Sequence, residues 1–160
     1  MHLHAIPDLP SICPGDNLAA MITDIVTADG TDVLDGDIFV IAQKIVSKSE
    51  DRYVNLSSII PSKNALKLAK SIHRDPRLVE VILSESIDVV RHAPGVLIVQ
   101  HRLGYVMANA GIDASNLEPA TGESERVLLL PQDPDATCRQ LRQQFESNFN
   151  RRVGVIINDR

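Results

Sequence analysis

The sequence predicts an α/β (α+β) protein with a mixed β-sheet flanked by helices. Short runs rich in Ile and Val alternate with longer segments whose apolar residues recur at helical spacing. The chain has 160 residues, which is long enough to bury a substantial core without disulfides. Aromatic residues make up only 3% of it, so the core is expected to consist of Ile, Val, Leu and Ala.

The first part of the chain predicts a strand–helix–strand unit. A strand at residues 2–6 leads through a proline-rich turn, its rigid exit, to a helix with Asp16 as N-cap. Gly30 stands just past this helix, where a left-handed C-terminal cap is expected. After a turn at Asp35-Gly36, a buried strand is expected at residues 38–42.

The middle of the chain predicts two capped helices followed by short strands. Residues 43–58 are mixed and polar, with a short strand near Tyr53-Val54. Ser62 is expected to cap a helix with Ala65, Leu66, Ala69 and Ile72 on its apolar face, and Asp75-Pro76 opens a second helix. Three strands joined by hairpin turns are then expected at residues 87–90, 96–99 and 105–108.

The last part predicts a loop, two buried strands and one helix. The loop spans 109–125, the strands 127–130 and 153–157, and the helix begins at Asp133-Pro134. Function in α/β folds usually lies beyond the carboxyl ends of strands. Because the chain stops at Arg160, directly after such a strand, we expect residues 1–160 to be one domain truncated after Asp159.

Composition excludes several classes of function. The net charge of −5 gives no basic field for a nucleic acid, and no apolar run approaches the length of a membrane span. Cys13 and Cys138 form neither a CxxC pair nor a zinc-binding spacing, so reduced thiols in a cytoplasmic protein are expected. Phosphate-binding loops of the usual kinds are absent from the sequence.

The segment 107–116 is the strongest candidate for a ligand site. Gly111 would allow close backbone approach, and Asp113 and Asn116 could face one ligand from a turn. Carboxylate oxygen is the donor that Mg²⁺ and Mn²⁺ prefer. From spacing alone, however, the favoured interpretation is a turn whose polar side chains only form hydrogen bonds with its own backbone.

Three weaker candidates lie elsewhere. Asp159, at the end of the last strand, could share divalent ions with Asp113, although it could equally be a solvated turn residue. Lys44 and Lys48 follow a strand and could contact phosphate, although a single Lys is more often ordinary surface. Leu9-Pro10 could face a base, although proline-rich turns are usually only turns.

An ordered set of motifs runs through almost the whole chain. It comprises Ile6-Pro7, Leu9-Pro10, Pro14-Gly15-Asp16, Asp35-Gly36-Asp37, the run 40–48, Asp75-Pro76-Arg77, His101-Arg102-Leu103-Gly104, the run 109–116, Leu129-Leu130-Pro131, Asp133-Pro134-Asp135-Ala136 and Ile156-Ile157-Asn158-Asp159. In this order, the set resembles the ligases that add L-glutamate to the deazaflavin coenzyme F420.

The resemblance implies particular roles for these residues. It implies GTP as a substrate, Mg²⁺ or Mn²⁺ as cofactor with K⁺ as a further candidate, and a cytoplasmic homodimer acting on the F420 precursor and L-glutamate. Asp113 and Asp159 match metal ligands, and no catalytic residue is assigned. The positions that match nucleotide contacts are Leu9, Pro10, Ser11, Ile12, Gln43, Lys48 and Asn116.

The chain departs from the family's pattern at its last residue. The family carries a metal-binding Ser or Thr after the aspartate, whereas this chain has Arg160, whose side chain offers only hydrogen-bond donors.

As a whole, the resemblance predicts a GTP-dependent ligase that forms an amide through an acyl phosphate. The alternative is a truncated, non-catalytic relative that binds a nucleotide or a partner, and an unrelated α/β protein is a remote third.

Overall fold

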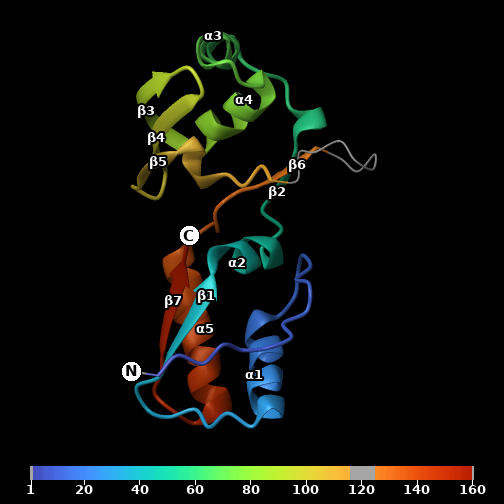
Figure 1. The fold of residues 1–160 in the computed structure, drawn as a ribbon, viewed down its shortest axis with the longest axis vertical. Helices are drawn as coiled ribbons and strands as arrows, with labels where there is room; N and C mark the ends of the chain where they lie inside the picture. Colours follow the sequence, from blue (N-terminus) through green and yellow to red (C-terminus); the bar gives the residue numbers. More distant parts are fainter. Residues whose placement is uncertain (1, 116–124, 160) are drawn as a thin grey trace. The chain divides into compact units, whose positions relative to one another are not determined.

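The two ends of the chain come together in one unit, and the middle of the chain forms another (Figure 1). These units are Met1–Arg52 with Pro131–Arg160, and Tyr53–Leu130. The computed structural model describes residues 2–115 and 125–159. Helices accompany both parallel and antiparallel strand pairs, so the predicted α/β class is confirmed.

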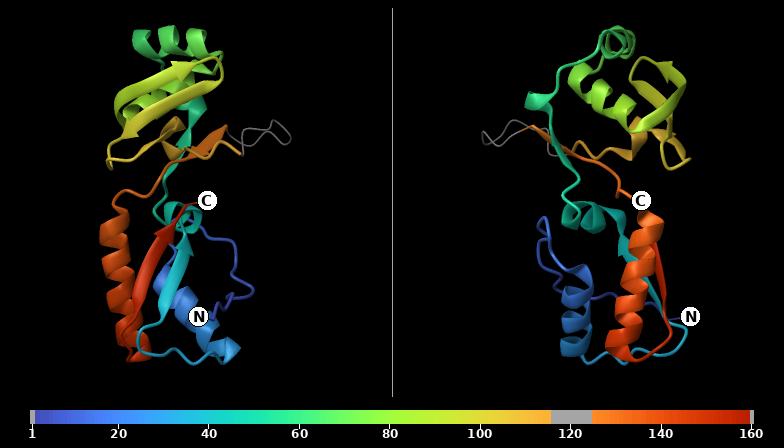
Figure 2. Two further views of the ribbon diagram at one scale, coloured as in Figure 1. Left: turned by 60° about the vertical axis from the view of Figure 1, so that its left-hand side comes forward. Right: turned by 180° about the vertical axis from the view of Figure 1, so that it is seen from behind.

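A parallel pair of strands lies at the centre of the first unit. β1 (Ile38–Ala42) pairs with β7 (Gly154–Asn158), from Ile38 opposite Gly154 to Ala42 opposite Asn158. The helices of this unit are α1 (Leu18–Asp29), α2 (Gln43–Ser49) and α5 (Pro134–Phe149). Figure 2 shows α5 running along β7, with α1 beside α5.

Only one face of the β1–β7 pair is packed against helices within this unit. Phe39 stacks on Phe145 and Phe149 of α5, with ring centroids 4.3 and 5.8 Å apart. On the opposite face, Ile38 and Val40 are 59% and 62% exposed. The prediction that the strands at 38–42 and 153–157 are buried is therefore wrong for this face. Alternate side chains of a strand point to opposite sides, so one face can be packed while the other is exposed.

The second unit combines two helices with two small antiparallel sheets. Ser62 and Asp75 cap the two helices as predicted, by accepting from the backbone N–H groups of Ala65 and Arg77. The elements are β2 (Tyr53–Asn55), the 3₁₀ turn η1 (Leu56–Ser58), α3 (Lys63–Ile72), α4 (Pro76–Ser84), β3 (Ser86–Ala93), β4 (Val96–His101), β5 (Val106–Ala108), η2 (Asn109–Gly111) and β6 (Arg126–Leu128). The first sheet pairs β2 with β6, and the second has the order β3-β4-β5.

The core of the second unit is drawn mainly from α3, α4 and β4. Ile72 of α3, Val79 and Ile82 of α4 and Val99 of β4 are all fully or almost fully buried. Leu66, which we expected on the apolar face of α3, is instead 51% exposed.

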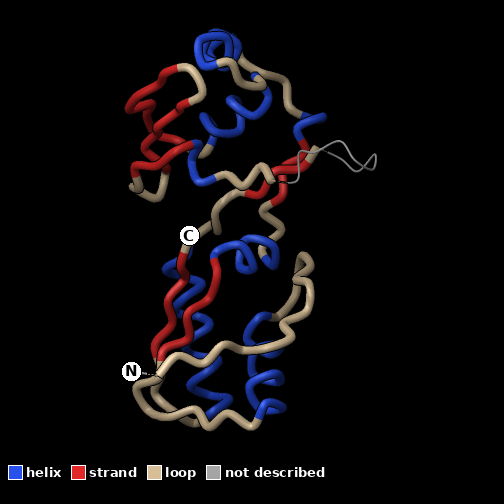
Figure 3. Tube along the Cα trace, viewed as in Figure 1, coloured by secondary structure: helices blue, strands red, loops and turns tan. Residues whose placement is uncertain are grey.

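The predicted first strand does not form, and residues 2–17 contain neither helix nor strand (Figure 3). The strand–helix–strand unit and the strand exit at the proline-rich turn are therefore wrong as well. His4 instead bonds to the end of α1, with its Nε2 2.9 Å from Asp29 Oδ2. The helix begins one residue later than predicted, because Asn17 is its N-cap and Asp16 accepts from the Cys13 N–H.

Among the described residues, no helix has both the length and the apolar character needed to cross a membrane.

Candidate functional site

Two of the predicted site residues follow the carboxyl ends of paired parallel strands. Ala42 lies opposite Asn158, so Gln43 and Asp159, the next residue of each strand, leave the sheet at the same end. Gln43 also begins α2, which carries Lys48 in its last turn (Figure 1). The first unit therefore places an amide and a carboxylate at the end of the sheet where α/β proteins bind ligands, and Lys48 lies in the helix that starts there.

The side chain of Gln43 is held in place within α2. Its Nε2 donates to the Oγ of Ser47, one helical turn later, at 2.5 Å. Ser47 is completely buried, so this bond fixes the amide and directs its acceptor atom, the carbonyl oxygen, away from Ser47. Sequence analysis missed both α2 and Ser47, although the i, i+4 spacing of Gln43 and Ser47 was a usable signal.

Lys48 combines partial burial with a charge that has no ion-pair partner in the described part of the chain. Its side chain is half-buried, and no carboxylate of the described residues lies within ion-pair distance of its ammonium group. Lysines are seldom buried unless they are paired. Lys48 is therefore a better candidate for an anionic ligand than the neighbouring, exposed Lys44.

The proline-rich segment lies beside the end of α2. The N–H of Gly15 donates to the carbonyl of Ser49 at 2.9 Å, which ties this loop to the helix. Leu9 and Ile12 pack into the core of the first unit, whereas Pro10 and Ser11 are exposed. A ligand on this segment would thus meet the side chains of Pro10 and Ser11, or the backbone.

Asp113 belongs to the second unit, where hydrogen bonds fix it firmly. Its backbone N–H and C=O both bond to Leu128, each at 2.9 Å. Its Oδ1 accepts from the N–H of Ser115 at 2.9 Å. This is the kind of turn that residue spacing alone favoured, in which the side chain bonds to the neighbouring backbone. A carboxylate has about four acceptor positions, so this bond is compatible with a metal ion on the same group.

The carboxylates suit a hard divalent cation but do not form a complete metal site in the described residues. Within residues 2–115 and 125–159, no three His, Cys, Asp or Glu side chains gather closely enough to hold a metal. Asp113 and Asp159 lie in different units, and Asn116 and Arg160 fall outside the described residues. Water or substrate oxygens would have to supply the remaining ligands.

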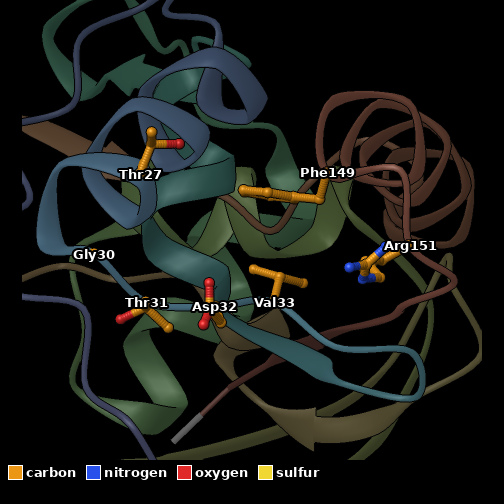
Figure 4. Close-up of a pocket in the computed structure, with 7 residues that line it drawn as sticks. All are labelled: Thr27, Gly30, Thr31, Asp32, Val33, Phe149 and Arg151. Atoms are coloured by element: carbon orange, nitrogen blue, oxygen red, sulfur yellow. The ribbon is translucent and has the colours of Figure 1, made fainter.

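A depression of about 290 Å³ lies in the first unit, and Figure 4 shows the side chains that line it. It is bordered by the C-terminal ends of α1 and α5, and none of the predicted site residues lines it. Its lining residues are Thr27, Gly30, Thr31, Asp32, Val33, Phe149 and Arg151.

Comparison with known proteins identifies the family. The F420-0:gamma-glutamyl ligase family matches the chain over residues 8–160. The chain belongs to this family. It is 38% identical to a coenzyme F420:L-glutamate ligase of Methanothermobacter thermautotrophicus over 157 residues, which are 98% of this chain and 60% of the relative.

Two further relatives carry the same name. The coenzyme F420:L-glutamate ligase of Methanopyrus kandleri is 39% identical, over 99% of this chain and 59% of its own length. That of Archaeoglobus fulgidus is 37% identical, over 96% of this chain and 57% of its own. The chain thus spans about 60% of the length of these F420-0:gamma-glutamyl ligase family members.

The family match includes both units, so every described candidate residue lies within it. Leu9 stands near its beginning and Asp159 near its end. The motifs that suggested the family from the sequence are therefore divided between the two units, each of which has its own hydrophobic core. No single helix or strand contains all of them.

Proposed function

We propose that this chain is the nucleotide- and metal-binding part of a GTP-dependent ligase that joins L-glutamate to the coenzyme F420 precursor. Family membership over residues 8–160 supports the reaction class. The observation that carries nucleotide binding is that Gln43 and Asp159 follow the carboxyl ends of the paired strands β1 and β7, and that Lys48 lies in the helix that Gln43 begins.

The proposed reaction takes place in two steps. A carboxylate oxygen of the precursor attacks the γ-phosphorus of GTP, which forms an acyl phosphate and releases GDP. The glutamate amine then attacks the acyl carbon, forms the amide, and releases phosphate and a proton. Activation is needed because a carboxylate and an amine do not condense unaided in water.

The chain's contribution to this chemistry is positioning and electrostatics. Lys48 would donate to phosphate oxygens, and Gln43 would present its carbonyl oxygen to a donor of the nucleotide. Asp113 and Asp159 would each be a candidate ligand for a divalent ion. Once bound, that ion neutralises phosphate charge.

Calorimetric titration of the 160-residue chain with GTP and Mn²⁺ tests the nucleotide site. We expect binding that requires the metal, is weaker for ATP and is lost in Asp113→Asn. Lys48→Met is expected to lower GTP affinity about tenfold or more, because a charge-assisted hydrogen bond typically contributes ~1.5–3 kcal/mol. Phosphate release that depends on both precursor and glutamate tests turnover.

Lys63→Met is the matched control, since Lys63 is an exposed lysine at the start of α3. It should leave GTP affinity unchanged. Equal losses in the two variants would point to non-specific charge rather than a site. A folded wild-type chain that binds no GTP would contradict the proposal, and binding without turnover would support the non-catalytic alternative.

A further inference from the structure

Three consecutive residues before Asp113 adopt the left-handed backbone conformation. The φ angles of Asn109, Ala110 and Gly111 are 51°, 54° and 66°. This conformation is unfavourable for residues with a Cβ, and each such residue costs about 1–3 kcal/mol. Two of the three, Asn109 and Ala110, therefore maintain a strained turn that ends one residue, Ile112, before the predicted ligand Asp113.

Packing holds this turn in place. Ala110 is completely buried in the core of the second unit. Gly111 is enclosed so tightly that an added Cβ would lie 2.9 Å from Met107 Cε and 3.0 Å from both Leu130 Cδ atoms. The Ile112 N–H closes the turn by donating to the Asn109 carbonyl at 3.1 Å. Asn109 is thus fixed at one end of a rigid turn whose other end leads into Asp113.

The side chain of Asn109 is not needed to build this turn. The bond that closes the turn uses only its backbone carbonyl. Its half-buried amide makes no hydrogen bond to any residue that the structure describes. Glycine would adopt the same φ at lower cost. Asn109 therefore holds a donor and an acceptor four residues before Asp113, and neither bonds to another group within the described residues.

We infer that Asn109 is a further ligand-contacting residue of the Asp113 site, and that its side-chain N–H donates to an oxygen of a phosphoryl group bound there. This inference rests on the proposed function for the identity of the ligand. A neutral donor suits that position, because it can bind a phosphoryl oxygen without competing with a cation for the Asp113 carboxylate.

The test compares Asn109→Gly with Asn150→Gly. Asn150, the C-cap of α5, is an exposed asparagine with nearly the same left-handed backbone, at φ 52°. Both substitutions relieve backbone strain, so both are expected to raise the melting temperature by about 2–4 °C. Only Asn109→Gly is expected to weaken GTP binding in the presence of Mn²⁺, by about tenfold.

A purely structural role for Asn109 predicts a different pattern. An Asn109→Gly chain that is equally or more stable and binds GTP as tightly as the wild type would overturn the inference. A variant that is more stable but binds more weakly supports it, because lost folding cannot explain the lost affinity.

The inference can fail independently of the proposed function. If the wild-type chain binds no GTP, the proposed function is contradicted, and the side-chain amide resonances of Asn109 become the deciding readout. These resonances are identified by their absence from the Asn109→Gly spectrum. A shift on adding Mg²⁺ with inorganic tripolyphosphate supports a phosphoryl contact, and unmoved resonances overturn it.

Discussion

Gly111 shows how a single residue can combine backbone and packing constraints. Its φ of 66° disfavours any Cβ, and Met107 and Leu130 fill the space that a Cβ would need. Gly111→Ala therefore faces both strain and overpacking. We expect it to lower the free energy of unfolding by about 2–4 kcal/mol, measured by urea denaturation.

Gly95→Ala separates the two causes. Gly95 has a similar φ of 77°, but no atom lies within 4 Å of its built Cβ. This variant should lose only the backbone contribution, about 1–2 kcal/mol. Equal losses for the two variants would mean that Met107 and Leu130 move aside without cost, and the tight packing at Gly111 would then have no energetic consequence.

Among the elements, those with local end signals were predictable and those set by distant contacts were not. Ser62 and Asp75-Pro76 mark helix starts with side chains that satisfy nearby N–H groups, so α3 and α4 follow from the sequence. Residues 2–6 predict a strand, yet a strand needs a pairing partner, and His4 bonds to Asp29 instead. The helix α2 was missed because residues 43–49 mix polar and apolar types and lack a side-chain cap.

The start of α4 has a built-in acid sensitivity. The Arg77 side chain donates to both carboxylate oxygens of Asp75, which lowers the pKa of Asp75 below its usual value. This stabilisation is fully present above pH ~4, which is the pKa of Asp in the unfolded chain. It disappears as the pH falls through the lower pKa that Asp75 has in the folded protein. Asp75→Asn keeps the cap but removes the ion pair. We expect it to be less stable than wild type at pH 7, with the difference shrinking at pH 3 in urea denaturation.

Asp133→Asn is the control for this prediction. Asp133 caps α5 by accepting from the Ala136 N–H, and in the described part of the chain no Arg side chain bonds to it. Its stability difference from wild type should change less between the two pH values. A difference for Asp75→Asn that is the same at pH 7 and pH 3 would show that the Arg77 contact contributes nothing to folding.

At the level of the whole molecule, local patterns predicted the class of fold but not its division into units. Periodicity identifies which face of a segment is apolar, but not which distant segment covers it. The pairing of β1 with β7 joins residues more than a hundred positions apart, so both ends of the chain enter one core. For the same reason the sequence suggested that Asp113 and Asp159 could share divalent ions, but it did not show that the two residues belong to different units.

The second unit should fold when it is produced alone. Every member of its core lies between Leu56 and Leu129, and the β2–β6 ladder, with Tyr53 opposite Leu128, brings its two ends together. We therefore expect residues 53–130 to give a cooperative thermal transition by circular dichroism and dispersed amide resonances. Val79→Asp, which places a carboxylate at a fully buried position, should abolish both signals. A wild-type fragment without a cooperative transition would mean that the core of this unit depends on the rest of the chain.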